Sequence, residues 1–192
     1  MTDHDGRLER GRARRDLILD AAVDVIASGG VSNLTHRAVA SAAGVSLASI
    51  TYHFPGIADL RLAAFNHAGS RIGLAFRSLV EAQADDPGRI PEIAAEYSVA
   101  LVGAGRQDTL AVYEMILAAS RDSALQPVIN ELDGHLADLL VPFVGNRATA
   151  LNAGSSIQGL ILSHIARGDS VHSRDLYDAV ADLIHRYAIS PD

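Results

Sequence analysis

The stretch from Thr35 to Phe54 constrains the fold more than any other part of the chain. It places an alanine at 40, a glycine at 44 and an isoleucine at 50. Ala40 is small enough for two helices to cross closely, Gly44 supplies backbone freedom for a tight turn, and Ile50 packs back against the first helix. This spacing predicts a helix-turn-helix whose second helix lies in the major groove of DNA. An ordinary helical hairpin with glycine at its turn is the alternative.

The ends of both short helices carry the residue types that such ends require. Thr35 can cap the first of them and Ser46 the second, because hydroxyl oxygens accept hydrogen bonds from free backbone amides. Pro55 disfavours helix at the residue before it, so the second helix ends near Phe54. On the second helix, small and hydroxyl side chains suit base edges and phosphates, and Leu47 or Ala48 can touch a thymine methyl group.

The rest of the chain shows the apolar period of helices and no convincing strand pattern. The expected fold is all-α, with about nine helices. Asp108 is expected to cap the sixth helix, and Pro142 to kink or end the seventh. Beyond the two short helices, the apolar stripes and breakers predict helices over about 17–29, 57–84, 91–102, 108–121, 125–143, 148–166 and 173–187.

The predicted organisation has three parts: a basic N-terminal arm over 1–14, a helix-turn-helix domain over 15–56, and a sensing and dimerisation domain over 57–192. The boundary falls near Pro55 and Gly56, at the start of the fourth helix. No flexible linker separates the two domains, so this helix is expected to couple them mechanically.

The formal net charge of −7 argues at first against a nucleic-acid partner. The acidity is uneven, however, because residues 1–61 hold seven arginines and seven acids, whereas the remainder holds nine arginines and 16 acids. Five arginines fall between Arg7 and Arg15. Such an arm is a candidate phosphate or minor-groove contact through Arg12 and Arg14. A frayed and solvated terminus is the alternative.

Composition excludes several classes of function. The chain has no cysteine, so disulfides, thiolate zinc sites and cysteine nucleophiles are ruled out. Its eight histidines form no metal-binding pair, and Ser155, Ser156 and His164 lack the context of a catalytic triad. We therefore expect no catalytic residues, no metal and no cofactor. The sequence has neither an apolar run of membrane-spanning length nor a signal peptide, which predicts a soluble cytoplasmic protein.

From Arg15 to Phe65 the chain resembles the TetR family of bacterial regulators. The match comprises a helix ending in Gly-Gly, then Leu34-Thr35, Val39-Ala40-x3-Gly44-Val45-Ser46, Ile50-x-Tyr52-His53-Phe54-Pro55, and Asp59-Leu60. The chain departs from the family pattern twice, with Thr51 where a tyrosine is common and Ile57 where a phosphate-binding lysine is usual. The resemblance and the motif together imply DNA contacts by Thr35, His36, Arg37, Ser46, Leu47, Ala48, Ser49, Thr51, Tyr52 and His53.

The resemblance also implies a ligand cavity within helices four to seven. The candidate lining residues, each of which is alternatively plain core, are His67, Phe76, Tyr97, Tyr113, Met115, His135 and His164. A lining of this kind fits an apolar or aromatic effector.

Helices eight and nine are implied to form a two-fold dimer interface, and the alternative is that their apolar faces complete the core of one protomer. The candidate interface residues are Ala153, Gly154, Ile157, Leu160, Ile161, Leu176, Val180, Leu183, Ile184 and Tyr187.

Together these features predict a homodimeric repressor that binds a palindromic operator and is released by a small molecule. A rival interpretation is a protein-interaction or small-molecule-binding module whose DNA binding has degenerated, which Ile57 favours. A helical enzyme or carrier with an incidental hairpin is a second rival, but no polar cluster converges in its C-terminal half.

Because isoleucine stands at position 57 instead of a phosphate-binding lysine, we expect the arginines of the N-terminal arm to supply the phosphate contact. Deleting residues 1 to 13 is expected to collapse operator binding, because the arm then supplies phosphate contacts that the fourth helix lacks. An electrophoretic mobility shift of the truncated protein measures this, and unchanged affinity would rule the substitution out.

Overall fold

The computed structural model describes residues 3–82, 86–168 and 173–187, and within these ranges the chain is helical, with no strand. No helix there combines the length and apolar character needed to cross a membrane. The described elements are α1 (Asp3–Gly29), η1 (Val31–Asn33), α2 (His36–Ala43), α3 (Leu47–His53), α4 (Ile57–Glu81), η2 (Pro87–Arg89), α5 (Ile90–Val102), α6 (Arg106–Ala119), η3 (Ser123–Leu125), α7 (Gln126–Val144), α8 (Arg147–Arg167) and α9 (Ser173–Tyr187).

The turn between α2 and α3 has the local structure that the sequence predicts. The Thr35 hydroxyl oxygen accepts from the amide of Ala38 at 3.1 Å, and Ser46 accepts from the amide of Ser49 at 3.2 Å. Gly44 follows α2 in the left-handed conformation, with φ of 63°, where a side chain would be strained. The predicted caps and turn are therefore confirmed.

The first three helices share one apolar core with parts of α4, α6 and η3. Ile18 of α1, Val39 of α2 and Ile50 of α3 are fully buried in it, together with Leu60 and Phe65 of α4. These side chains come from four helices, so burying them against one another fixes the angle at which α3 leaves the body.

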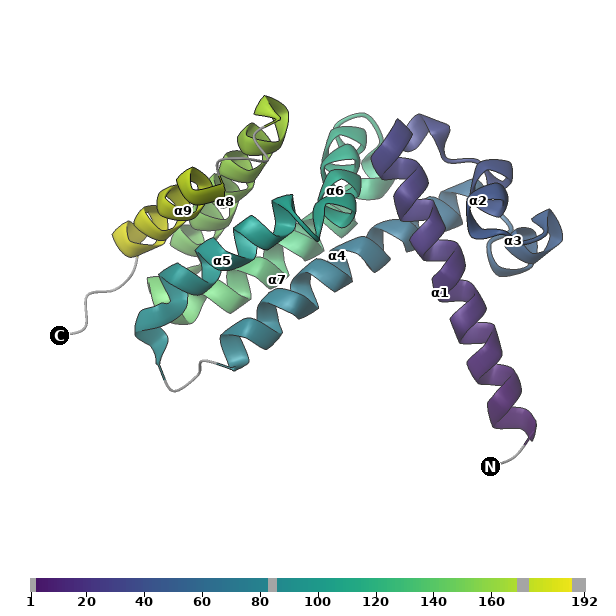
Figure 1. The fold of residues 1–192 in the computed structure, drawn as a ribbon, viewed down its shortest axis with the longest axis horizontal. Coiled ribbons are helices and arrows are strands. Elements are labelled where there is room, and N and C mark those ends of the chain that lie inside the picture. The colour runs from purple at the N-terminus through teal and green to yellow at the C-terminus, as the bar shows by residue number, and fades with distance from the viewer. Residues whose placement is uncertain (1–2, 83–85, 169–172, 188–192) are drawn as a thin grey trace.

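The predicted N-terminal arm is the first part of a helix. Residues 3–14 continue without a break into the buried part of α1. Figure 1 shows this end of α1 projecting away from the other helices. Exposed Arg12 and Arg14 are therefore held on a helix rather than on an extended segment.

A second core lies at the other end of the molecule, where α5, α7, α8 and α9 meet (Figure 1). α9 packs on α5 and α8, and α8 packs on α7. Phe76 brings the distal part of α4 into this core. α7 continues through Pro142 to Val144, so the proline does not end the helix early.

Asp108 does not cap α6 as predicted. The helix begins at Arg106 with Gly105 before it. The Asp108 carboxylate instead lies 2.9 Å from the Arg71 guanidinium of α4. The nearly buried carboxylate is thus paired with a cation of another helix rather than with a backbone amide at the start of α6.

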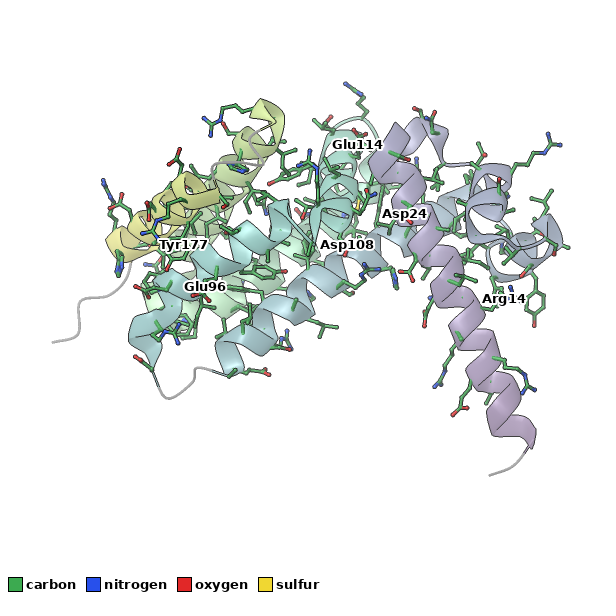
Figure 2. The ribbon with its side chains drawn as sticks, viewed as in Figure 1. Arg14, Asp24, Glu96, Asp108, Glu114 and Tyr177 are labelled. Carbon is green, nitrogen blue, oxygen red and sulfur yellow. The ribbon has the colours of Figure 1, made fainter. Side chains whose placement is uncertain are left out.

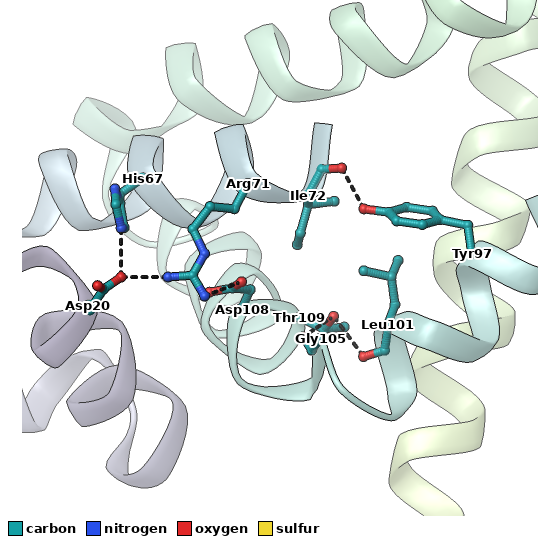
Figure 3. Close-up of polar contacts among 9 residues, drawn as sticks. All are labelled: Asp20, His67, Arg71, Ile72, Tyr97, Leu101, Gly105, Asp108 and Thr109. Carbon is teal, nitrogen blue, oxygen red and sulfur yellow. Dashed lines mark hydrogen bonds and ion pairs between the residues drawn. The ribbon is translucent and has the colours of Figure 1, made fainter. Parts of the chain in front are cut away.

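Arg71 is the middle of a charged cluster that joins three helices, α1, α4 and α6 (Figure 3). Its guanidinium lies 2.5 Å from the Asp20 carboxylate of α1 and bridges it to Asp108 of α6. His67, one turn before Arg71 on α4, places Nε2 2.8 Å from the same Asp20 oxygen. The cluster therefore ties the helix-turn-helix end of the molecule to the larger helical domain.

Asp108 makes the stability of the fold depend on pH. Burial raises the pKa of Asp108, and the opposing attraction of Arg71 does not cancel this effect. The folded state therefore binds the proton at a higher pH than the unfolded state, so this group destabilises the fold as pH rises through its titration. Asp108→Asn is expected to raise the free energy of unfolding at neutral pH, and the gain is expected to shrink towards about pH 4.

Urea unfolding of the wild-type protein and of Asp108→Asn, at neutral pH and at about pH 4, measures this difference in the free energy of unfolding. Asp16→Asn, at an exposed position in the middle of α1, is the control and is expected to leave the free energy of unfolding unchanged. An Asp108→Asn protein that is equally destabilised at both pH values would contradict the assignment.

Candidate functional site

The outer face of α3 is the best-exposed surface of the helix-turn-helix. Ile50 is fully buried and fixes the helix against the core, whereas the Tyr52 side chain is 83% exposed and Leu47 is 43% exposed. Ala48 and Thr51 are exposed too. Ser49 and His53 are half-buried, so they lie at the edges of this face and not in its most exposed part.

The hydroxyl groups around this face differ in the hydrogen-bonding capacity that remains free for a partner. Thr35 and Ser46 accept cap bonds through their oxygens, so each keeps a hydroxyl hydrogen for an acceptor such as a phosphate oxygen. The Thr51 hydroxyl lies 3.2 Å from the carbonyls of both Leu47 and Ala48 and donates inside the helix. Thr51 therefore presents a methyl group and oxygen lone pairs to the outside.

The start of α2 adds one available cation. Arg37 is exposed there, beside the free amides of the helix terminus. His36 is half-buried, and its Nε2 is buried without a hydrogen-bond partner. Arg37 is therefore the more accessible of the two residues, and a DNA contact by His36 stays a prediction.

Arginines on α1 flank the same surface. Arg15 stacks over the Phe54 ring at 5.1 Å and so attaches α1 to the end of α3. Arg12 and Arg14 precede it and remain exposed. Figure 2 shows Arg14 on the part of α1 that leaves the body of the molecule.

The first turn of α4 has no cation. Ile57 opens the helix and is 43% exposed. The Gly56 amide donates to the Asp59 carboxylate at 3.2 Å, which places a negative charge at this helix start. The phosphate anchoring that a basic residue would give here is absent from the described structure, so the arginines of α1 and α2 are the cations beside α3.

A cavity of about 330 Å³ lies between α4, α5, α6, α7 and α8. Of the seven predicted lining residues, five line it: Phe76, Tyr97, Tyr113, Met115 and His135. The prediction missed small and polar lining residues such as Gly69, Thr109 and Gln158. Gly69 lies on the apolar stripe of α4, but nothing in its own sequence context marks it as facing a cavity.

The other two predicted lining residues lie elsewhere. His67 points from α4 towards α1, because its Nε2 is bonded to Asp20. His164 is 4% exposed within α8 and does not belong to the cavity wall. A histidine on a sensor helix therefore does not identify a ligand contact, since the neighbouring helices decide which way it faces.

Two tyrosines form hydrogen bonds between helices that line the cavity. The Tyr97 hydroxyl of α5 donates to the Ile72 carbonyl of α4 at 2.5 Å, and Tyr113 of α6 donates to the Gln158 carbonyl of α8 at 2.6 Å. Burial raises the pKa of Tyr113 to about 12. Burial and the nearby charge of Asp108 also raise the pKa of Tyr97. Both phenols therefore stay neutral at physiological pH.

The predicted dimer faces of α8 and α9 are core faces in this protomer. Seven of the ten residues are buried: Ala153, Gly154, Ile157, Ile161, Leu176, Val180 and Ile184. The other three, Leu160, Leu183 and Tyr187, are half-buried against the same core. Helices α5 and α7 cover these stripes within the protomer. Which of these residues also meet a second protomer stays a prediction.

A different face of α8 is exposed and carries no charge. It includes Leu151 at 38% exposure and Leu162 at 45%, with exposed Ser155 and Gly159 between them. A Cβ built on Gly159 would meet nothing within 4 Å. This stripe, which we call the outer α8 face, could admit another helix at close range.

No group of three or more metal-ligating side chains occurs among the described residues.

Comparisons with known proteins agree with this geometry. The family model for bacterial regulatory proteins of the tetR family matches residues 18–64, and the model for the tetracyclin repressor-like C-terminal domain matches residues 85–188. No match is found among curated proteins.

Solved structures match over nearly the whole chain. A member of the TetR family, SCO1917 from Streptomyces coelicolor A3, is 30% identical with a TM-score of 0.73, over 88% of this chain and 97% of that one. The multidrug binding protein EbrR complexed with proflavin is 31% identical with a TM-score of 0.60, over 88% and 99%. A transcriptional regulator from Rhodococcus sp. Rha1 shares the fold at 21% identity with a TM-score of 0.76, over 90% and 95%.

The helix-turn-helix, the helical domain behind it and the two family models lead to one conclusion. The chain belongs to the TetR family of bacterial regulatory proteins and is a DNA-binding transcriptional regulator with a helix-turn-helix.

Proposed function

We propose that this regulator is a homodimeric repressor that a small apolar or aromatic molecule releases from a palindromic operator. The observation that carries the proposal is the position of α4. Leu60 and Phe65 of this helix belong to the core of the helix-turn-helix. Phe65 also lines the cavity, as does Phe76 further along the same helix. A ligand that displaces the distal part of α4 thus acts on the helix that positions α3.

The charged cluster around Arg71 supports this coupling. It pairs α4 with Asp20 of α1 and with Asp108 of α6. The carbonyl of Ile72, the next residue, holds the Tyr97 hydroxyl at the cavity wall. Ligand binding that moves Tyr97 therefore acts one residue away from the ion pairs that join the two ends of the molecule.

DNA recognition is proposed to use α3 in the major groove. Leu47, Ala48 and Tyr52 meet base edges or sugars there, and Thr51 offers its methyl group. Arg37, with Arg12 and Arg14 of α1, supplies the cations that hold the phosphates. This arrangement lets an acidic protein bind DNA, because the acidic surplus lies beyond residue 61.

The outer α8 face is the proposed dimer interface. It is uncharged, and its small residues between two leucines allow close helix packing. Reading two half-sites one helical turn apart requires a two-fold partner. The interface therefore uses the side of α8 opposite the one that the sequence predicted.

A relative supports the class of effector. EbrR is described as a multidrug binding protein, with structures of its complexes with proflavin, ethidium and malachite green. The cavity here is lined mainly by aliphatic and aromatic side chains. An aromatic molecule would bury its rings against Phe76 and Tyr97, whose own rings lie 5.2 Å apart.

A second candidate function is a ligand-binding or protein-interaction module that has lost DNA binding. The absence of a cation at Ile57, together with Asp59 one turn into α4, is the observation that favours it. DNA binding by the intact protein separates the two candidates.

Arg37→Ala tests the repressor. Losing one phosphate contact is expected to weaken operator binding and to reduce the slope of log affinity against log salt concentration by about one. Mobility shifts with the chain's own upstream DNA at several salt concentrations measure both effects. Arg106→Ala, at an exposed arginine on α6, is the control and is expected to keep the wild-type slope. An intact wild-type dimer that selects no fragment from genomic DNA would support the second candidate instead.

Leu162→Glu tests the dimer. A buried, unpaired carboxylate in a two-fold interface is expected to shift the protein to monomer and to weaken operator binding. Light scattering after size exclusion measures the mass. Leu117→Glu, at a leucine of α6 with 58% exposure, is the matched control and is expected to remain dimeric. A Leu162→Glu protein that stays dimeric would place the interface elsewhere.

A further inference from the structure

The buried and half-buried hydroxyl groups of the cavity lining share one hydrogen-bond direction, because each donates to the protein backbone. Four hydroxyl side chains in the lining are buried or half-buried, namely Tyr97, Ser98, Thr109 and Tyr113. Each donates its hydrogen to a backbone carbonyl. What these groups leave for a ligand is therefore oxygen lone pairs.

The two phenols show this most clearly. Tyr97 donates to the Ile72 carbonyl and Tyr113 to the Gln158 carbonyl, at 2.5 and 2.6 Å. Burial keeps both phenols protonated, so each hydrogen stays in its bond to the carbonyl. Turning either hydroxyl towards a ligand would break that bond, a loss of roughly fivefold in affinity.

The aliphatic hydroxyls behave in the same way. Ser98 donates to the Ala94 carbonyl at 2.7 Å, one turn back on α5. The Thr109 hydroxyl lies 2.9 Å from the Gly105 carbonyl and 3.0 Å from that of Leu101. Both oxygens remain as acceptors.

The remaining polar lining does not reverse this polarity. Gln158 donates one amide hydrogen to the Asp133 carboxylate at 3.1 Å, which leaves it one N–H and its own carbonyl oxygen. The other polar lining residues are exposed, namely Asn66, Ser70, Arg77, Glu131 and His135. Arg77 and Glu131 carry opposite charges, and water competes for the hydrogen bonds of all five, so they contribute little to the choice between donor and acceptor ligands.

We propose that the cavity selects an apolar aromatic molecule that donates hydrogen bonds, of the arylamine class, and discriminates against carboxylates. A donor N–H can meet the oxygen lone pairs of Tyr97 without breaking a bond in the cavity wall, whereas the Tyr113 oxygen is also approached by the backbone N–H of Leu162. A carboxylate or another acceptor would face those lone pairs and lose its hydration without replacement. This inference rests on the proposed function, in which the same cavity holds the effector.

Four probes with one ring system test the selection: aminonaphthalene, dimethylaminonaphthalene, naphthalene and naphthoate. The first is an uncharged donor at neutral pH, the second keeps the nitrogen but has no N–H, and the last is an anionic acceptor. Their affinities for the full chain without DNA are measured by fluorescence or calorimetry. Aminonaphthalene is expected to bind at least about fivefold more tightly than its dimethyl analogue, with naphthoate weakest.

Removing the acceptors locates the contact. Tyr97→Phe and Tyr113→Phe keep both rings, and the double variant is expected to bind aminonaphthalene no better than dimethylaminonaphthalene. Unchanged binding of the dimethyl probe shows that the cavity is still formed. Tyr177→Phe, on α9 outside the lining, is the matched control and is expected to keep the preference.

The outcomes separate this inference from the function on which it rests. If the probes bind but naphthoate equals or exceeds aminonaphthalene, or the two amines bind equally, the donor selection is overturned while the sensing cavity stands. A wild-type preference that persists in the double tyrosine variant overturns it too. If none of the four probes binds, the inference and the proposed small-molecule control fail together, although DNA binding can still be measured independently.

Discussion

The burial of α4 in two apolar cores is the constraint on which the rest of this structure depends. Leu60 and Phe65 fill the core of the helix-turn-helix, and Phe76 fills the core of the larger domain. The connection between the domains is thus a packed helix with no flexible linker. Close-packed interiors resist small displacements, so a shift of this helix at one end must be accommodated at the other. The ion pairs of Arg71 add a charged tie at the middle.

Hydrogen bonds connect the helices that form the walls of the cavity. Tyr97 links α5 to α4, and Tyr113 links α6 to α8, each through a carbonyl of the opposite helix. A buried hydroxyl must find a partner, and on these walls the available partners are backbone carbonyls. The same bonds link helices across the cavity and engage the hydrogens of both phenols. The proposed ligand preference rests on these bonds.

Predictions that depend on residues close in the sequence were correct, whereas two that depend on residues of other helices were wrong. The caps at Thr35 and Ser46 and the turn at Gly44 were predicted correctly, because each depends on residues only three or four positions away. Asp108 was expected to cap α6 and instead pairs with Arg71, which lies on another helix. His67 was expected at the cavity and instead meets Asp20. In both cases a partner far along the chain outweighed the local pattern.

By itself, the sequence determined the helix-turn-helix and the all-helical fold, since helical period, capping and turn chemistry are local properties of the chain. The TetR family followed from resemblance over the same stretch and was shown by the family models. The tertiary structure alone decided which helices cover each apolar stripe. The stripes of α8 and α9 are covered by α5 and α7 within one protomer, and the outer α8 face is left exposed. An apolar period shows that a face must be buried, but it does not name the neighbour. The cavity and the direction of its hydrogen bonds depend on that choice of neighbours.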